Sequence, residues 1–222
     1  MSYVDAFFDR DHDKIYVVER HKDGKRVFKD SQVKYTFFYE DPNGKFTSIY
    51  GTHLTKVTCN SNKAFRKELK LVPDGRKLFE SDLNPVYAHL SEHYQDAEAP
   101  KLNVVFFDIE TDFCKERGYS SPDEAFMPIT SIGAYQQWSD TMVVFAVPPK
   151  TMSMETAELM FQDMPEVIIC KDEKTMLECF IDFVQDADIL SGWNSTSFDI
   201  PYTVNRIIKV LSKTEARKLC LS

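Results

Sequence analysis

The chain has 222 residues, of which 43% are hydrophobic and 28% are charged, and its formal net charge is −8. The 17 phenylalanines and 10 tyrosines, against only seven glycines, exclude a disordered or low-complexity chain. No apolar run is long enough for a transmembrane helix and the N-terminus has no secretory signal, so no membrane association is expected. The five cysteines are never spaced as Cys-x-x-Cys, which argues against a disulfide framework and favours a reducing, cytoplasmic compartment.

The charge is distributed unevenly along the chain. Residues 1–100 contain 16 Lys and Arg against 16 Asp and Glu, whereas residues 101–222 contain 11 against 19. Two modules, one of them rich in functional carboxylates, would produce this asymmetry, and so would a solvated acidic surface. We predict two domains, 1–100 and 101–222, joined by a linker at residues 96–100.

The first hundred residues are predicted to be rich in β-structure, with two helices. Turn signals at 22–25 and 41–44 separate predicted strands over 14–20, 33–40, 46–50 and 55–59. One helix is expected to start at a cap, Asn60 or Ser61, and to run to about Leu71. The other is expected to start at Asn84-Pro85, with proline in its first turn.

The second part of the chain is predicted to be a mixed α/β domain with helices against a central sheet. Its predicted strands cover 102–109, 129–138, 141–147, 166–170 and 189–193. Its predicted helices cover 153–164, 172–185 and 197–211, and a polar loop covers 112–127. Because the first strand is a continuous apolar run that ends in an acid, we expect it to be buried on both faces.

The most informative stretch is 106–111, Phe-Phe-Asp-Ile-Glu-Thr. Alternate side chains of a strand share a face, so Asp108 and Glu110 are expected on one face and Phe107 and Ile109 on the other. Two carboxylates on one side of an apolar strand repel each other unless a cation lies between them, and Mg²⁺ or Mn²⁺ prefers such oxygen ligands. Acids that are simply solvated where strand and loop meet explain the spacing equally well.

A second stretch, 191–199, leaves a predicted strand through a polar loop and enters a helix. The Ser and Thr residues at 195–197 are suitable N-caps, which places Asp199 at a helix N-terminus, where a negative charge is favoured for structural reasons alone. Ligands also tend to bind where strand ends open onto helix starts. If the strands over 102–110 and 189–193 are neighbours, Asp199 meets the two acids of the first stretch.

Together the two stretches resemble a known family. Phe-Asp-Ile-Glu-Thr at 107–111, followed by Asn-x-x-x-Phe-Asp at 194–199, resembles the first two exonuclease motifs of family B DNA polymerases. The residues over 192–207 are most similar to the replicative polymerases of T-even-like bacteriophages. Asp-x-Glu alone is a weak signal, but the two motifs together are specific. By this resemblance, 1–100 corresponds to the N-terminal domain of the family and 101–222 to its 3′→5′ proofreading domain.

The resemblance implies an α/β chain, α+β overall, with a β-rich N-terminal domain followed by a ribonuclease H-like exonuclease domain. It implies a two-metal site with Mg²⁺ or Mn²⁺. Asp108, Glu110 and Asp199 would be the catalytic metal ligands. Asn194 and Phe198 match positions that line a single-stranded 3′ end, although we favour a core role for Phe198. The implied partners are single-stranded DNA 3′ ends and primer–template DNA in replication, and a phage-derived chain would act in the host cytoplasm.

Two parts of the family pattern are absent from the sequence. No Tyr-x-x-x-Asp motif, the third exonuclease motif, follows Asp199, and the carboxylates of the polymerase domain are missing. We therefore expect a fragment of a DNA polymerase, truncated before the third motif. The isolated chain is expected to lack polymerase activity and to have little or no exonuclease activity. The remaining polymerase chain would be a further partner, and an uncovered apolar sheet face would favour self-association.

A non-catalytic nucleic-acid-binding module is the alternative. Lys63, Arg66, Lys67 and Lys70 are three, four and seven residues apart, so they share one face of a predicted helix and could contact phosphates. A solvated helix face is the simpler interpretation. Some T-even-like relatives bind RNA through the N-terminal domain, so the resemblance extends this alternative to RNA. A free-standing exonuclease would need a complete acidic site, which the sequence does not show.

Other acids and histidines carry no predicted site. Asp112 and Glu116 are interpreted as loop charges, and the aspartates at 182, 186 and 188 as a solvated helix end. His89 and His93 are four residues apart on a predicted helix, but no Glu follows His89 as in a zinc protease motif. They are interpreted as surface residues.

Overall fold

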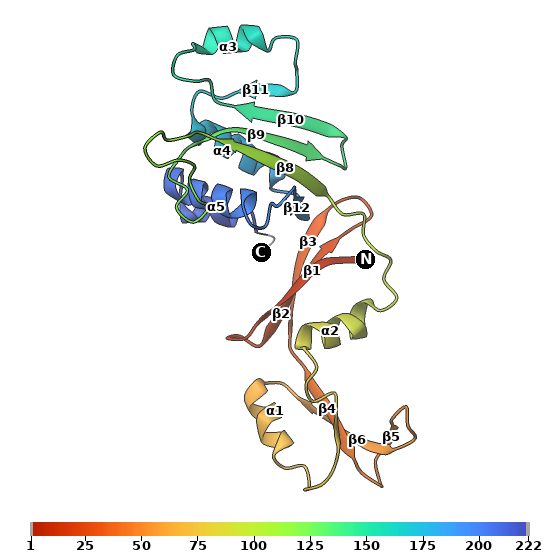
Figure 1. Ribbon diagram of the computed structural model, residues 1–222. Helices are drawn as coiled ribbons and strands as arrows, with labels where there is room; N and C mark the ends of the chain where they lie inside the picture. Colours follow the sequence, from red (N-terminus) through yellow and green to blue (C-terminus); the bar gives the residue numbers. More distant parts are fainter. Residues whose placement is uncertain (1, 221–222) are drawn as a thin grey trace. The chain divides into compact units, whose positions relative to one another are not determined.

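The structure, a computed structural model, describes residues 2–220, and the chain divides into two compact units, Met1–Lys101 and Leu102–Ser222 (Figure 1). Residues 221 and 222, with which the predicted second domain ends, lie outside the described part. Within residues 2–220, no helix is long and apolar enough to cross a membrane. The predicted fold class is confirmed, because the first unit is rich in β-structure and the second is a mixed α/β sheet with helices.

The first unit contains two antiparallel sheets, with strand orders β1-β2-β3 and β5-β6-β4-β7. The strands are β1 (Ser2–Asp9), β2 (Lys14–Arg20), β3 (Arg26–Gln32), β4 (Tyr35–Glu40), β5 (Phe46–Thr47), β6 (His53–Cys59) and β7 (Leu78–Phe79). A small buried core draws residues from both sheets: Ile15, Val17, Val33, Tyr35 and Cys59. The helices α1 (Asn62–Leu69) and α2 (Pro85–Tyr94) add half-buried side chains to it.

Both helices of this unit begin where local chemistry dictates. The Ser61 side chain accepts a hydrogen bond from the backbone N–H of Ala64 (3.2 Å), and α1 starts at the next residue. The Asn84 side chain accepts one from Val86 (2.9 Å), and the proline after it starts α2 with its fixed φ. The predicted helix starts are therefore confirmed.

The second unit is built on a five-stranded sheet with the order β11-β10-β9-β8-β12. The strands are β8 (Val104–Thr111), β9 (Ile129–Gln136), β10 (Thr141–Ala146), β11 (Val167–Ile169) and β12 (Ile189–Ser191). The helices are α3 (Met154–Met160), α4 (Glu173–Val184), α5 (Asp199–Val210) and α6 (Lys213–Arg217). The central strands β8, β9 and β10 are antiparallel, whereas β11 and β12 each run parallel to their neighbour.

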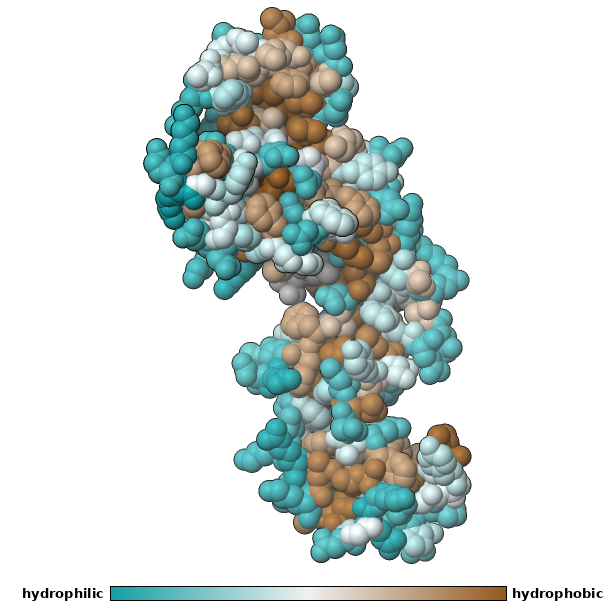
Figure 2. All heavy atoms as spheres, in the orientation of Figure 1, coloured by the Kyte–Doolittle hydropathy of each residue, from teal (hydrophilic) through white to brown (hydrophobic). Residues whose placement is uncertain are grey.

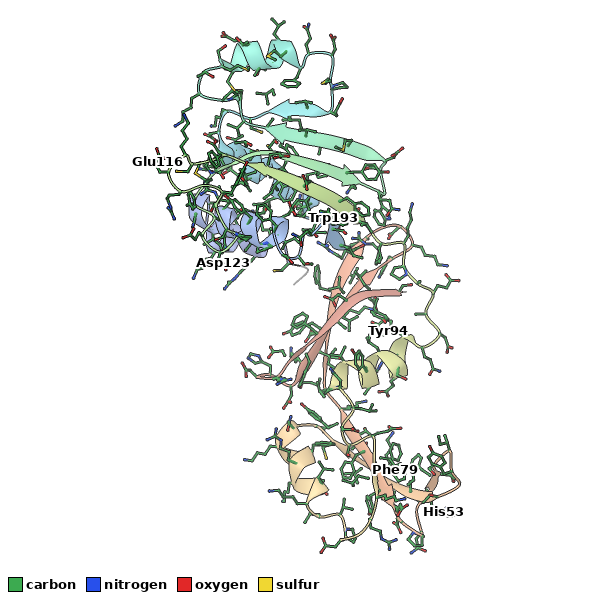
Figure 3. The ribbon with its side chains drawn as sticks, in the orientation of Figure 1. His53, Phe79, Tyr94, Glu116, Asp123 and Trp193 are labelled. Atoms are coloured by element: carbon green, nitrogen blue, oxygen red, sulfur yellow. The ribbon has the colours of Figure 1, made fainter. Side chains whose placement is uncertain are left out.

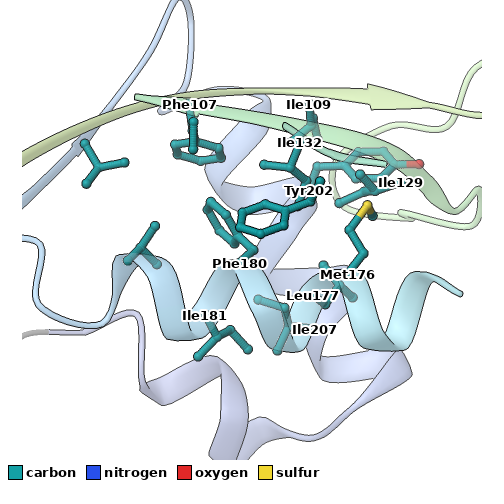
Figure 4. Close-up of a cluster of buried hydrophobic side chains, with 14 of the residues drawn as sticks. Phe107, Ile109, Ile129, Ile132, Met176, Leu177, Phe180, Ile181, Tyr202 and Ile207 are labelled. Carbon is teal, nitrogen blue, oxygen red and sulfur yellow. The ribbon is translucent and has the colours of Figure 1, made fainter. Parts of the chain in front are cut away.

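The main core lies between this sheet and the helices α4 and α5, which are on the same side of it (Figure 1). Phe107 of β8 meets Phe180 of α4 with ring centroids 5.2 Å apart, and Tyr202 of α5 is fully buried beside them (Figure 4). Fully burying one large apolar side chain contributes about 1.5–3 kcal/mol. This core therefore fixes the sheet and both helices relative to one another.

The first strand of this unit differs from its prediction. Phe107 and Ile109 are buried, but Phe106 is 43% exposed and the acids that alternate with them are exposed. Within residues 2–220, only the face of β8 towards α4 and α5 is covered. The prediction that this strand is buried on both faces is therefore wrong. The continuous run of apolar residues could not reveal this, because the exposed aromatic has the same hydrophobicity as a core residue.

Some elements were not predicted from the sequence. They are the strands β1, β3 and β7 and the short helix α6. Several predicted strands and helices are also longer than those observed: β5 ends at Thr47 and α3 ends at Met160. Strand β3 carries mostly exposed side chains and so lacks the alternation that marks a half-buried strand.

Candidate functional site

The exposed face of β8 carries the two acids of the first motif. Asp108 and Glu110 are both exposed and lie on the face opposite the core, so the predicted alternation is confirmed. On the neighbouring strand β9, Gly133 lies opposite Asp108 and Ser131 lies opposite Glu110. The register shifts between Glu110 and Thr111, which pairs with Ile129, so the strand pairing is irregular directly after this acid.

Strand β12 lies beside β8 on the other side, which is the condition under which the sequence placed Asp199 near the two acids, and its last residue, Ser191, is level with Phe106. The next residue, Gly192, runs so close to β8 that a Cβ on it would lie 2.3 Å from the carbonyl oxygen of Phe107. Only glycine can occupy this position without moving one of the strands. The close approach brings the second motif to the end of the sheet where the first motif lies.

A tight turn then carries the chain into α5. Asn194 has a positive φ of 52°, a conformation that Asn tolerates better than most residues. Its carbonyl oxygen accepts hydrogen bonds from the backbone N–H groups of Ser197 (3.0 Å) and Phe198 (3.1 Å). The N-cap position is Phe198, and no side chain caps α5. The prediction that one of the Ser and Thr residues at 195–197 caps this helix is therefore wrong, because main-chain hydrogen bonds close the turn instead.

Asp199, the first residue of α5, is 4% exposed and lies against β8. Its Oδ1 atom accepts a hydrogen bond from the backbone N–H of Ile109 at 3.3 Å. Burial raises the pKa of the Asp199 carboxyl above its usual range, and the negative charge of Asp108 raises it further. The N–H of Ile109 works in the opposite direction, because it stabilises the charged form.

The arrangement therefore brings two carboxylates from separate motifs, Asp108 and Asp199, close enough to repel each other. Oxygen donors that repel each other are a chemically suitable environment for a hard divalent cation. Within residues 2–220, however, no group of three His, Cys, Asp or Glu side chains converges as a metal site. Glu110 is exposed on β8, whereas Asp199 is buried at the strand's edge, so the three acids do not form one ligand set in this structure.

Helix α5 also holds the loop that follows the first motif. The hydroxyl of Tyr202 donates to the carbonyl oxygen of Met127 (2.8 Å), and the side-chain amide of Asn205 donates to the carbonyl oxygen of Pro122 (2.9 Å). Glu116 and Asp123 are on this loop (Figure 3). The helix that carries Asp199 therefore also fixes the chain that leaves Glu110.

A largely buried ion pair completes this attachment. The guanidinium of Arg206 on α5 donates to the carboxylate of Glu173 on α4, with Nε and Oε1 2.8 Å apart, and the side chains are only 11% and 13% exposed. Arg206 also donates to the carbonyl oxygen of Ala125 (3.0 Å), and Glu173 accepts from the backbone N–H of Ile129 (2.8 Å). Neither residue has a role that follows from the sequence, because their separation in the chain gives no local signal.

The remaining residues of the second motif divide between core and surface. Phe198 packs against the main core, with its ring centroid 5.4 Å from that of Tyr202. Asn194 is exposed, and the side chain of Trp193 is 92% exposed (Figure 3). Trp193 is not among the predicted site residues, although its position between Gly192 and Asn194 of the second motif was a usable signal.

The basic residues of the first unit lie on one face of α1. Lys63, Arg66, Lys67 and Lys70 are exposed, and none of them forms an ion pair within the described residues. Figure 2 shows a hydrophilic surface over this helix. The residues between them on α1, such as Phe65, are half-buried against β4 and β6, so the predicted division of the helix into two faces is confirmed.

The predicted solvated helix end is wrong for Asp188. This residue is 8% exposed, and its carboxylate accepts a hydrogen bond from the backbone N–H of Asn103 (2.8 Å). The side-chain amide of Asn103 in turn donates to the carbonyl oxygen of Asp186 (2.9 Å). These bonds connect the segment before β12 to the segment before β8, because both strands start at the same end of the sheet.

The two histidines of α2 stack on each other, with ring centroids 4.3 Å apart. His93 is exposed and its Nδ1 atom lies 3.0 Å from the carbonyl oxygen of His89, which is half-buried. Burial lowers the pKa of His89, and the neighbouring ring lowers it further. The pair fits a surface role on the helix.

Comparisons with known proteins agree with this arrangement. A sequence model of the exonuclease domain of DNA polymerase family B matches residues 74–220. The DNA-directed DNA polymerase of Escherichia phage RB69 is 28% identical over 231 residues, which cover 91% of this chain and 25% of that protein. The DNA polymerase delta catalytic subunit of Plasmodium falciparum is 32% identical over 135 residues, which cover 58% of this chain and 12% of that protein.

A solved structure shows the same fold. The family B DNA polymerase of the archaeon Pyrobaculum calidifontis matches with a TM-score of 0.57 at 19% identity, over 95% of this chain and 32% of that one. The chain thus spans a quarter or less of the length of these curated relatives. The family match itself covers well over half of the chain and confirms the resemblance drawn from the two motifs. The chain belongs to DNA polymerase family B, and residues 74–220 match the exonuclease domain of that family.

Proposed function

We propose that this chain carries the 3′→5′ proofreading exonuclease site of a family B DNA polymerase. In this proposal the site hydrolyses phosphodiester bonds at the single-stranded 3′ end of DNA, and primer–template DNA is the wider partner. The observation that carries the proposal is the approach of Asp108 and Asp199, which come from motifs far apart in the sequence. Residues 1–100 would form the N-terminal domain and residues 101–222 the exonuclease domain.

Asp108, Glu110 and Asp199 are the proposed catalytic acids and the proposed ligands of Mg²⁺ or Mn²⁺. When bound between carboxylates, such a cation supplies an activated water and stabilises charge on the leaving 3′ oxygen. Asp108 and Glu110 offer exposed oxygen atoms on the open sheet face. Asp199 is held in place by the N–H of Ile109, so its carboxylate is oriented before a ligand arrives.

The residues around the acids support a single-stranded substrate. Asn194 and Trp193 are exposed in the turn that leads to Asp199, where an amide can hydrogen-bond a nucleotide and an indole can stack on an unpaired base. Phe198 packs against the core and would hold the start of α5 instead of contacting the strand. The proposed roles are therefore direct contact for the first two residues and positioning for the third.

Mn²⁺ titration by calorimetry tests the proposal. Wild-type protein should bind Mn²⁺, and the Asp108→Ala and Asp199→Asn variants should lose most of this affinity. Glu116→Gln is a matched control, because Glu116 is an exposed carboxylate on the loop after β8. Because the isolated chain is expected to have little or no exonuclease activity, shortening of a 5′-labelled single strand from its 3′ end should be weak, and whatever shortening occurs should stop in Asp108→Ala. Mn²⁺ affinity that is unchanged in both acid variants would contradict the proposal.

A nucleic-acid-binding surface on α1 is the second candidate, for DNA or for RNA. It is favoured by one observation: Lys63, Arg66, Lys67 and Lys70 are exposed on one face without an ion pair in the described residues. Charge reversal at Lys67 and Lys70 should weaken binding of a single-stranded oligonucleotide and reduce its salt dependence. Binding through this face should not change in Asp108→Ala, which separates the two candidates.

A further inference from the structure

Gly133 lies in the middle of β9, on the exposed face of the five-stranded sheet. Its neighbours in register are Asp108 on β8 and Val144 on β10, while Ile132 and Ala134 beside it in sequence point into the core. Residues directly opposite each other in an antiparallel pair share a face. A side chain at position 133 would therefore stand next to the Asp108 carboxylate.

The other six glycines of the chain each have a local structural reason. Four have a positive φ between 75° and 86°, which favours glycine: Gly24, Gly51, Gly75 and Gly118. The other two lie directly against a neighbouring backbone, where a Cβ would come within 2.3 Å of a main-chain atom: Gly44 and Gly192. Replacing any of these six would strain the fold.

Gly133 has neither reason. Its φ is not positive, and a Cβ on it would have one neighbour within 4 Å, the Cε atom of Met142 at 3.9 Å, which is ordinary contact. Glycine weakens a strand interior, so its presence there often marks a place where a ligand or another backbone approaches closely. Among residues 2–220, no main-chain atom of another segment lies within 4 Å of the position that a Cβ on Gly133 would take.

We infer that Gly133 is a positioning residue that keeps the sheet face beside Asp108 open for the terminal nucleotide of a single-stranded nucleic acid. It acts through the absence of a side chain: the nucleotide lies over the glycine, and its phosphate would meet the Asp108 carboxylate through the divalent cation that the proposed function assigns to this acid. This inference rests on the proposed function, because it assigns the substrate strand to the face on which Asp108 lies.

A size series at this position tests the inference. The probe is a 5′-fluorescein pentathymidylate, with its dissociation constant measured by anisotropy in Ca²⁺. Gly133→Ala removes the glycine but leaves most of the space, so its dissociation constant should stay within about twofold of wild type. Gly133→Val and the similarly shaped Gly133→Thr fill the space and should each weaken binding by about tenfold or more. Their melting temperatures should not fall below wild type, because β-branched residues suit a strand.

The outcomes separate this inference from the proposed function. Unchanged affinity in Gly133→Val and Gly133→Thr, with binding weakened in Asp108→Ala, would overturn the inference and leave the proposed function standing. An equal loss in Gly133→Ala and Gly133→Val would overturn it too, because the effect would then not follow side-chain size. Affinity that Asp108→Ala leaves unchanged would contradict both.

Discussion

The carboxylate of Asp199 accepts a hydrogen bond from the backbone N–H of Ile109, with the two atoms 3.3 Å apart. Strand β12 ends at Ser191, level with Phe106, and so does not extend as far as Ile109. The carboxylate takes the position that a further strand residue would have taken. This bond helps to fasten the start of α5 to β8 and places a buried negative charge next to Asp108.

Replacing Asp199 with asparagine should stabilise the protein at neutral pH. The pKa of this carboxyl is raised above 3.8, first by burial and then by Asp108, so the native state binds the proton more tightly than the unfolded state. The contribution of this carboxyl to the free energy of unfolding is therefore fully present below about pH 4 and is lost as the pH rises through its native pKa. Asp199→Asn removes this decrease and can keep the bond from Ile109.

Thermal unfolding of both proteins across this pH range measures the effect. The melting temperature of Asp199→Asn should exceed that of wild type at pH 7. The two melting temperatures should converge as the pH falls towards the pKa of the carboxyl in the unfolded state. Added Mn²⁺ should reduce the difference at pH 7, because a cation relieves the repulsion in wild type. A difference that grows on acidification would show that the carboxyl has a lowered pKa instead.

Alanine at two glycines of the site should have opposite effects on stability. At Gly192 the added Cβ would lie 2.3 Å from the Phe107 oxygen and push β12 away from β8, so Gly192→Ala should cost about 1–3 kcal/mol or more. At Gly133 the same change meets no close atom and reduces the entropy of the unfolded chain, so Gly133→Ala should add about 0.5–1 kcal/mol. Urea unfolding of the two variants measures both effects, and a similar loss in both would contradict this account.

The parts of the site that the sequence predicted are those set by local rules. The shared face of Asp108 and Glu110 follows from the alternation of side chains on a strand. Likewise, the starts of α1 and α2 follow from side-chain caps within three residues, at Ser61 and Asn84. Such features depend only on neighbours in the chain, so no knowledge of the fold was needed.

The parts that were missed depend on residues far apart in the sequence. Whether β8 is covered on one face or two depends on where α4 and α5 pack, and the exposed Phe106 gives no local sign of it. Three suitable cap residues precede α5, yet the turn is closed by the carbonyl oxygen of Asn194 in a left-handed conformation. Asp188 has the sequence context of a solvated helix end, and its partner is the distant Asn103.

Removing the hydroxyl of Tyr202 should destabilise the second unit by about 1–2 kcal/mol. Tyr202 is fully buried, and its hydroxyl donates to the carbonyl oxygen of Met127, so Tyr202→Phe leaves that oxygen without this donor. Tyr119→Phe is the control, because Tyr119 is 77% exposed on the same loop and should change stability little. Urea unfolding measures both variants, and faster proteolysis within residues 112–127 of Tyr202→Phe would locate the loss. Equal stability of the two variants would show that the bond contributes nothing.

Removing Arg206 should cost more than any exposed ion pair of the chain. Arg206→Ala leaves the carboxylate of Glu173 buried without its partner, for which about 3–5 kcal/mol is typical. Lys174→Ala is the control on the same helix as Glu173: its pair with Glu178, 3.9 Å apart, is exposed and should contribute about 0.5 kcal/mol or less.

Chemical denaturation of the two variants gives the difference, and a loss below about 1 kcal/mol in Arg206→Ala would show that the pair is solvated in solution. Arg206→Ala also tests whether this ion pair supports the proposed metal site. Arg206 also donates to the carbonyl oxygen of Ala125, so its loss removes one of the bonds that hold the loop after Glu110 against α5. Mn²⁺ affinity should therefore fall in Arg206→Ala although every proposed ligand is still present, whereas Lys174→Ala should retain it. If both variants bind Mn²⁺ as wild type does, the loop is not needed to position the acids.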